Sequence, residues 1–352
     1  MKALSLIAAA ESLLIPILAL LLSLAVFGLF LLAVDSDPFG VFYSMYRGGF
    51  GSGFSWRNTL ERAAPLMLTA LCTALPARLG LIMIGGEGAL VIGGIAAASI
   101  GLSLNGNPPW LVMVAMVLAG AVSGGLWIAS TGWLKHYRGV NETITSLLFN
   151  YIAIALLNHL ITGPLRDPQS LNKPATMPIG SANMLADIPE LGVHWGLVLG
   201  LVLCLIYYLI FQQTTLGFAV RIIGGNIRAA KIVGLPVGRL TVMTCFFAGA
   251  AAGLAGMIEV AAIHGTANGS LAAGYGYAGI LVAFLARQNP LTVIPVAILL
   301  GGISASAGLL QRSHHLPDAT VFILQGIIFI VILLSETLYG RLKLVCDERS
   351  RT

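Results

Sequence analysis

Residues 214–236 read TTLGFAVRIIGGNIRAAKIVGLP, and an apolar run of membrane length lies on either side of them. In this stretch and just after it every charged residue is basic, as the positive-inside rule expects of a cytoplasmic loop. These residues are Arg221, Arg228, Lys231 and Arg239. Asn226 is a favoured helix N-cap, and Gly234 followed by Pro236 is a helix stop. About two helical turns are therefore predicted over residues 227–233, a shape suited to docking into another protein.

The composition indicates a polytopic membrane protein. Of 352 residues, 57% are hydrophobic and 9% are charged, whereas soluble domains have about 25% charged residues. Because roughly 20 apolar residues cross a bilayer, the length allows about ten transmembrane helices in an all-α fold. The net charge of +5 is spread along the chain and does not suggest nucleic acid. The four cysteines are isolated, and neither they nor the histidines show metal-ligand spacing.

The hydrophobic runs predict a single transmembrane domain over residues 1–352. The first run is longer than the apolar region of a signal peptide and is interpreted as an uncleaved span. Residues 35–59 are too polar to cross and are expected outside. A cytoplasmic loop over residues 213–239 and an external loop over residues 162–194 lie within the domain. The predicted spans cover residues 13–34, 60–77, a run ending near 104, 110–134, 141–161, 195–211, 240–263, a short 275–286, 291–310 and 319–338.

The charges fit this topology with both termini cytoplasmic. Thirteen of the 19 lysines and arginines fall on the predicted inner side. They are Lys2, Arg78, Lys135, Arg138, Arg221, Arg228, Lys231, Arg239, Arg287, Arg341, Lys343, Arg349 and Arg351.

Spans two to five and seven to ten form two four-helix blocks that begin on opposite sides of the membrane, which predicts inverted repeats. Each block contains a glycine-broken stretch, GGEG at residues 85–88 and GYGY at residues 274–277. Paired interruptions of this kind indicate the substrate path of a transporter.

The cytoplasmic loop resembles the coupling loop of permease subunits of bacterial ATP-binding-cassette importers for nucleosides, simple sugars and branched-chain amino acids. The matching residues are Thr215, Gly217, Arg221, Gly224, Asn226, Arg228, Ala229, Ala230 and Gly234. Gly225 and Ile227 depart from the usual polar residue and proline. The resemblance implies that this loop lies in a groove of the ATPase subunit, with the small face at Ala230 needed for close docking.

Further stretches resemble nucleoside-type permeases. They are the Ile-Gly-x-Glu-Gly segment around Glu87, the segment over residues 140–151 that begins Val-Asn-Glu and ends with Asn150 and Tyr151, and the Gly-x-x-Glu-Val segment around Glu259. Ala89 replaces the usual glutamine of the first. The predicted substrate path contains Glu87, Asn150, Glu259 and Tyr275. The alternatives are a structural carboxylate at Glu87, an interhelical hydrogen bond at Asn150 and an interfacial aromatic at Tyr275.

The sequence has no Walker motif, so it is not expected to be an enzyme or to bind a cofactor itself. The resemblance implies an importer of the bacterial inner membrane. A partner ATPase would use ATP and Mg²⁺, and an external binding protein or lipoprotein would deliver cargo. The second permease is left open between a homodimer and a paralogue. Nucleosides are the favoured cargo, with ribose- or galactose-type sugars or a riboflavin-like vitamin as alternatives. An ion-coupled secondary transporter or a membrane enzyme is the alternative of another class.

Overall fold

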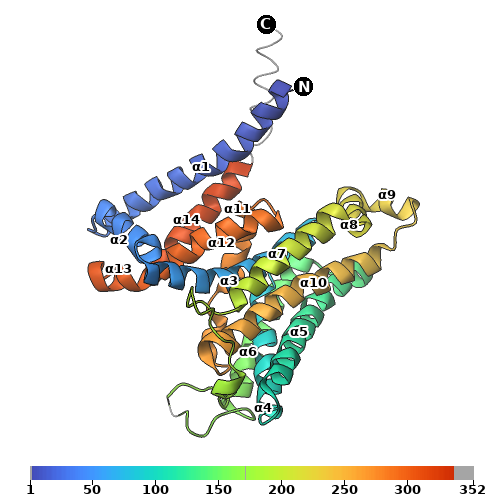
Figure 1. Cartoon of the computed structure of the whole chain (residues 1–352). Coiled ribbons are helices and arrows are strands. Elements are labelled where there is room, and N and C mark those ends of the chain that lie inside the picture. Colours follow the sequence, from blue (N-terminus) through green and yellow to red (C-terminus); the bar gives the residue numbers. More distant parts are fainter. Residues whose placement is uncertain (1, 171, 337–352) are drawn as a thin grey trace. The chain divides into compact units, whose positions relative to one another are not determined.

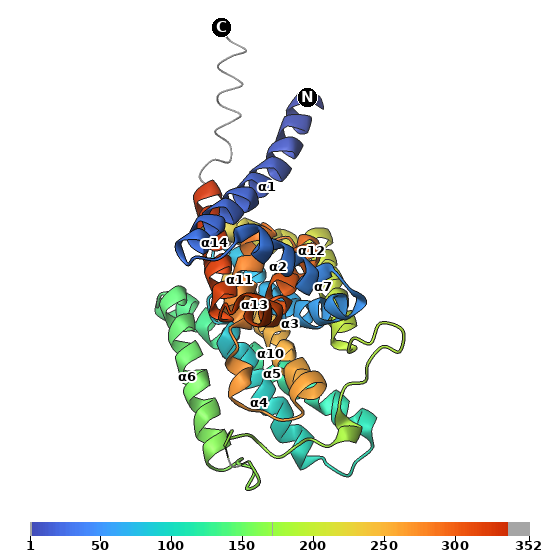
Figure 2. The same ribbon diagram turned by 90° about the vertical axis from the view of Figure 1, so that its left-hand side faces the viewer.

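The computed structural model describes residues 2–170 and 172–336, and over these residues the regular structure is helical (Figures 1 and 2). The all-α fold class is therefore confirmed. Within the described residues, six helical stretches are long and apolar enough to cross a membrane: Gly86–Ser103, Pro109–Arg138, Glu142–Thr162, Gly196–Gln213, Val237–His264 and Pro290–His314. The total of about ten spans stays a prediction. The predicted cytoplasmic tail with Arg341, Lys343, Arg349 and Arg351 lies outside the described residues.

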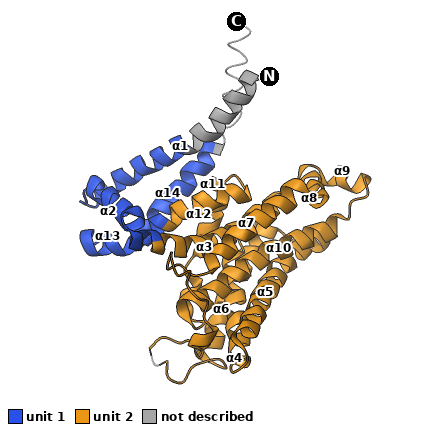
Figure 3. Cartoon of the chain, in the orientation of Figure 1, with its two compact units in different colours: residues 1–56, 302–352 blue, residues 57–301 orange. Residues whose placement is uncertain are grey.

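The chain divides into two compact units (Figure 3). The terminal unit comprises Met1–Trp56 and Gly302–Thr352, and the central unit comprises Arg57–Gly301. The helices α3 (Gly53–Ala77) and α12 (Pro290–Ala305) pass from one unit to the other. That residues 1–352 form a single domain stays a prediction.

The terminal unit contains two pairs of packed helices, α1 with α14 and α2 with α13. Their bounds are α1 Lys2–Ala33, α2 Pro38–Phe50, α13 Ala307–His314 and α14 Ala319–Glu336. Helix α2 was not part of the predicted topology. It forms because Asp37 accepts hydrogen bonds from the backbone N–H groups of Phe39 and Gly40, which would otherwise be unpaired in the first turn.

The central unit carries the remaining elements. In chain order they are α4 (Gly86–Ser103), α5 (Pro109–Arg138), α6 (Glu142–Thr162), η1 (Ser181–Asn183), α7 (Gly196–Gln213), α8 (Thr215–Gly225), α9 (Ile227–Ile232), α10 (Val237–Ile258), η2 (Glu259–His264), η3 (Gly269–Ala272) and α11 (Tyr275–Leu285). The η2 segment is π-helical and continues α10 directly. The short helix predicted over residues 275–286 is confirmed as α11.

The core of the central unit is the packing of α4, α5 and α10 through small residues. A Cβ atom built on Gly253 of α10 would collide with the carbonyl oxygen of Gly120 in α5. One built on Gly93 of α4 would collide with Gly253 itself. Small residues let helix backbones approach closely where lipid offers no hydrophobic gain for larger ones. As a result, 78% of an 18-residue apolar segment within Val237–His264 is buried.

Helix α8 is a second element without a prediction from the sequence, which indicates a loop over residues 214–226. Thr214 caps it by accepting a hydrogen bond from the N–H of Gly217. One face is buried, with Ala219, Val220 and Ile223 inside. Burial of this apolar face stabilises α8, although the pattern of polar residues in the sequence does not predict a helix there.

Candidate functional site

Two features of the central unit coincide with the predicted functional residues. One is the junction between the two glycine-broken stretches, where α4 and α11 begin. The other is the short helix α9 with the elements that support it.

The junction begins with an extended stretch between α3 and α4, which lies against α6. Three side chains of α6, spaced i, i+3 and i+7, lie on one face of that helix. They form hydrogen bonds with the backbone of the extended stretch. Thr143 Oγ1 donates to the carbonyl of Ile82 at 3.0 Å, and Ser146 Oγ accepts from the N–H of Ile84 at 3.0 Å. Non-helical backbone inside a membrane protein is tolerated only where its polar groups find partners in this way.

Asn150 completes this set. Its Nδ2 donates to the carbonyl of Ile84 at 2.9 Å, and its Oδ1 accepts from the N–H of Gly88 at 2.8 Å. Nδ2 also lies 3.4 Å from the hydroxyl of Tyr277. The side chain is 0% exposed. In this conformation Asn150 therefore faces the backbone of its own chain, which is the geometry of the interhelical alternative, and its contact with cargo stays a prediction.

Glu87 joins the two broken stretches. Its Oε1 accepts from the N–H of Gly274 at 2.7 Å and its Oε2 accepts from the N–H of Gly276 at 2.6 Å. These N–H groups belong to the first turn of α11, where donors lack intrahelical partners and the helix dipole favours an anion. The carboxylate is 1% exposed. Glu87 thus ties the start of α4 to the start of α11.

Glycines are required at this junction because backbones pass close together. A Cβ on Gly276 would collide with the backbone nitrogen of Glu87, and one on Gly88 would lie 2.9 Å from Asn150 Oδ1. Thr69 of α3 adds a further bond, from its Oγ1 to the carbonyl of Tyr275 at 3.0 Å. The junction therefore joins α3, α4, α6 and α11.

Glu259 and Tyr275 lie near this junction without bonding to it through their side chains. Glu259 is 2% exposed at the start of the π-helical segment, a deviation often found at functional sites. Its Oε2 is 3.5 Å from His264 Nε2. Its Oε1 has no hydrogen-bond partner among the described residues. Arg62 of α3 interacts electrostatically with both Glu259 and Tyr275. Their role in the substrate path stays a prediction.

The predicted capped helix is present as α9. The Oδ1 of Asn226 accepts from the N–H groups of Arg228 at 2.9 Å and Ala229 at 3.1 Å. Gly234 follows the helix with a φ of +81°, the left-handed conformation that ends a helix and that glycine adopts readily. Helix α9 lies at one end of the central unit, beyond the end of α8 (Figure 1).

The apolar side chains of this helix and of the turn after it are exposed. Ile227 is 50% exposed, Ile232 is 86% exposed and Val233 is 71% exposed. Arg228 and Lys231 are exposed as well. We call these five residues the α9 face. An apolar surface with basic neighbours, carried on a short capped helix, is suited to covering by a partner protein.

Ala230 does not belong to this face, and its predicted role in docking to an ATPase stays a prediction. It is 0% exposed because it points into the chain, where the carbonyl of Ala230 also accepts from the N–H of Leu235. The side chain of Ala230 is thus packed inside the chain.

Three other residues of the predicted coupling loop hold α8 in place. Gly217 lets α8 turn tightly against Phe211 at the end of α7, since a Cβ there would collide with the Phe211 carbonyl oxygen. Arg221 donates to that same oxygen at 3.0 Å, and Arg78 donates to it at 3.3 Å. Gly224 lies against the carbonyl of Arg78. These contacts fix α8 to the turn that precedes the extended stretch.

Three residues of the junction were not predicted from the sequence: Thr143, Ser146 and Thr69. Thr143 and Ser146 share a helix face with Asn150, and their spacing was visible in the sequence. No local pattern indicated that this face would meet extended backbone rather than another helix. Thr69 had no sequence signal, because its partner is the carbonyl of a residue 206 positions away.

Comparison with known proteins finds a transporter permease family and several transporter permeases similar to this chain. The family model described as branched-chain amino acid transport system, permease component, matches residues 56–333. The glucose ABC transporter permease protein of Haloferax volcanii is 31% identical over 331 residues, which are 91% of this chain and 87% of that protein. The guanosine ABC transporter permease protein of Bacillus subtilis is 30% identical over 94% of this chain and 97% of its own length. A nucleoside ABC transporter permease protein of Lactococcus lactis is 26% identical over 90% of both chains.

Proposed function

This chain belongs to the family of branched-chain amino acid transport system permease components, and from that premise we propose that it is the membrane-spanning subunit of an ATP-driven nucleoside importer. The observation that carries the cargo assignment is the similarity to guanosine and nucleoside permeases along almost the whole chain. The glucose permease of comparable identity supports a simple sugar as the second candidate.

The contacts of the central unit support a mechanism in which ATP hydrolysis acts at a distance. We assign the α9 face to an ATPase subunit. Helix α8, which precedes α9, lies against Arg78 through Gly224. The extended stretch begins just after Arg78 and leads to Glu87, which is bonded to the first turn of α11. Movement of the α9 face therefore has a contiguous route of packed backbone to the junction of the broken helices.

At the junction, the two broken stretches move as one body while Glu87 keeps both hydrogen bonds. Closure of the partner ATPases would shift α8 and, through the extended stretch, the starts of α4 and α11. That shift would open the path alternately to each side, as in other transporters built around discontinuous helices. ATP and Mg²⁺ would be used by the partner, and the chain would make no covalent change to its cargo.

The remaining partners follow from the same proposal. A second permease, either a copy of this chain or a paralogue, would complete the path, and an external binding protein or lipoprotein would deliver the nucleoside. Both termini would face the cytoplasm.

The test is uptake by proteoliposomes that contain this permease, its genomic neighbours encoding an ATPase and a second permease, and the external binding protein. Labelled guanosine, uridine, ribose, galactose and riboflavin are offered separately, with ATP inside. We expect ATP-dependent accumulation of nucleosides and little of the others. Accumulation of a sugar alone would establish the second candidate. Uptake driven by an ion gradient without ATP would contradict both.

A further inference from the structure

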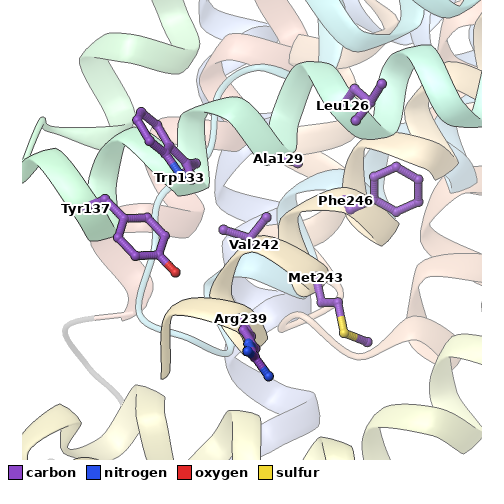
Figure 4. Close-up of a pocket in the computed structure, with 8 residues that line it drawn as sticks. All are labelled: Leu126, Ala129, Trp133, Tyr137, Arg239, Val242, Met243 and Phe246. Atoms are coloured by element: carbon purple, nitrogen blue, oxygen red, sulfur yellow. The ribbon is translucent and has the colours of Figure 1, made fainter. Parts of the chain in front are cut away.

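A groove in the central unit is lined by residues that belong neither to the junction nor to the α9 face. Helices α5 and α10 line it with four residues each (Figure 4). They are Leu126, Ala129, Trp133 and Tyr137 from α5 and Arg239, Val242, Met243 and Phe246 from α10. The cavity volume is about 450 Å³. Seven of the eight side chains present apolar surface, so the groove suits a hydrocarbon ligand.

The length of the groove matches one leaflet of a bilayer. At 1.5 Å per residue, α5 rises about 16 Å between Leu126 and Tyr137, and the hydrocarbon core of a bilayer is about 30 Å thick. Leu126 is 60% exposed and Met243 is 43% exposed, so the groove opens sideways. An acyl chain can therefore lie along it without leaving the membrane.

One end of the groove is polar and basic. Trp133 and Tyr137 lie there, with 44% and 55% exposure, and such aromatics are enriched where the membrane meets water. The guanidinium of Arg138 lies 5.9 Å from the centre of the Trp133 ring. Arg239 is exposed at the start of α10, and no ion pair or hydrogen bond of its side chain is present among the described residues. Two arginines thus stand at the end of an apolar groove.

We propose that this groove binds an anionic phospholipid, with an acyl chain between α5 and α10 and the phosphate at Arg239 and Arg138. The charge at the mouth favours an anion, and basic pockets between transmembrane helices bind anionic head groups. A second copy of this chain is a poorer occupant. A two-fold contact centred on the groove would bring the partner's own Arg239 to the same mouth, and like charges repel.

The position of this lipid gives it a structural consequence. Only residues 233–236 separate α9 from α10. Arg239, which would bind the phosphate, therefore lies a few residues after the helix that carries the α9 face. The proposal itself does not depend on which partner covers that face.

The test uses the full chain in phosphatidylcholine nanodiscs and measures quenching of tryptophan fluorescence by dibrominated acyl chains. The brominated lipid is either phosphatidylglycerol or phosphatidylcholine, at equal mole fraction. We expect stronger quenching by phosphatidylglycerol, and loss of that difference in Trp133→Phe. Arg239→Gln should lower the preference for phosphatidylglycerol about fivefold, the effect of one basic residue at a membrane surface. Arg166→Gln, in the loop after α6, should leave it unchanged.

Equal quenching of the unmodified chain by the two lipids would overturn the proposal, and this comparison needs no variant to fold. A separate outcome would also overturn it. If Met243→Cys forms disulfide-linked dimers in membranes and added phosphatidylglycerol does not reduce them, the groove is covered by a second copy of the chain.

Discussion

The carboxylate of Glu87 accepts a 2.6 Å hydrogen bond from the backbone N–H of Gly276, a residue 189 positions further along the chain. With its second bond to Gly274, it satisfies two donors in the first turn of α11. The two glycine-broken stretches, each at the start of a short or interrupted helix, are therefore a single structural feature. Paired breaks in the sequence indicated a common role, and this carboxylate is the physical link between them.

Replacement of Glu87 should destabilise the permease. Glu87→Gln exchanges one acceptor oxygen for an N–H₂ group, which leaves a buried backbone donor unpaired and removes the charge from the helix start. We expect a loss of about 2–3 kcal/mol in the free energy of unfolding, measured as thermal unfolding in detergent. Glu190→Gln, an exposed residue of the external loop, is the matched control. A midpoint equal to that of the control would show that the second acceptor oxygen and the charge of Glu87 contribute nothing to stability.

Thr143, Ser146 and Asn150 of α6 should contribute to the stability of the fold according to the number and burial of their hydrogen bonds. Thr143→Val removes one bond at an exposed edge, Ser146→Ala removes one at a buried site, and Asn150→Leu leaves two buried backbone groups unpaired. The loss of stability should increase in that order, from below 1 kcal/mol to about 2–4 kcal/mol. Uptake by Asn150→Leu should fall by the same fraction for guanosine and for uridine. A loss that differs between cargoes would instead place Asn150 in the substrate path.

The exposed and buried sides of α9 should give opposite phenotypes. Ile232→Asp places a charge on an 86% exposed position, so the permease should unfold at an unchanged temperature while co-purification with the ATPase falls at least tenfold. Ala230→Glu buries an unpaired carboxylate inside the permease and should lower the unfolding temperature itself. If Ile232→Asp retains the ATPase in full, the α9 face is not the docking surface.

Acid should weaken the structure around His194, just before α7. Burial lowers the pKa of this imidazole, although Glu61 and Asp187 partly oppose the shift. Because the folded state binds the proton less well than the unfolded state, the stability due to neutral His194 is present above about pH 6.5 and declines below it. Unfolding temperatures from pH 7.5 to 5.5 should fall more steeply in the unmodified chain than in His194→Gln. His315→Gln, which changes an exposed histidine, should keep the steep slope.

The predicted topology places residues 172 and 228 on opposite sides of the membrane. In a Cys346→Ser background, where Cys72, Cys204 and Cys245 are buried, an impermeant thiol reagent should label Asn172→Cys in intact cells. Arg228→Cys should react only after permeabilisation. Labelling of both in intact cells would contradict the orientation and the cytoplasmic position of α9.

The sequence determined those features that arise from neighbouring residues or from composition. Hydrophobic runs indicated a helical membrane protein, and Asn226 with Gly234 predicted the bounds of α9 to within a residue. The two glycine-broken stretches were also visible, since glycine marks the places where helices begin or break. Each of these signals acts within a few residues, so a linear pattern records it.

The tertiary structure decided which groups those breaks bind. The partners of Glu87 are the N–H groups of Gly274 and Gly276, which only the fold brings to its carboxylate, and its place in the substrate path stays a prediction. The backbone partners of Asn150 likewise lie 62 and 66 positions before it. The direction of Ala230 likewise depended on packing, because a six-residue helix with apolar residues on several sides has no unique buried face. A hydrogen bond between distant segments depends on backbone positions set by close packing of glycines in α4, α5 and α10, and no local preference specifies those positions.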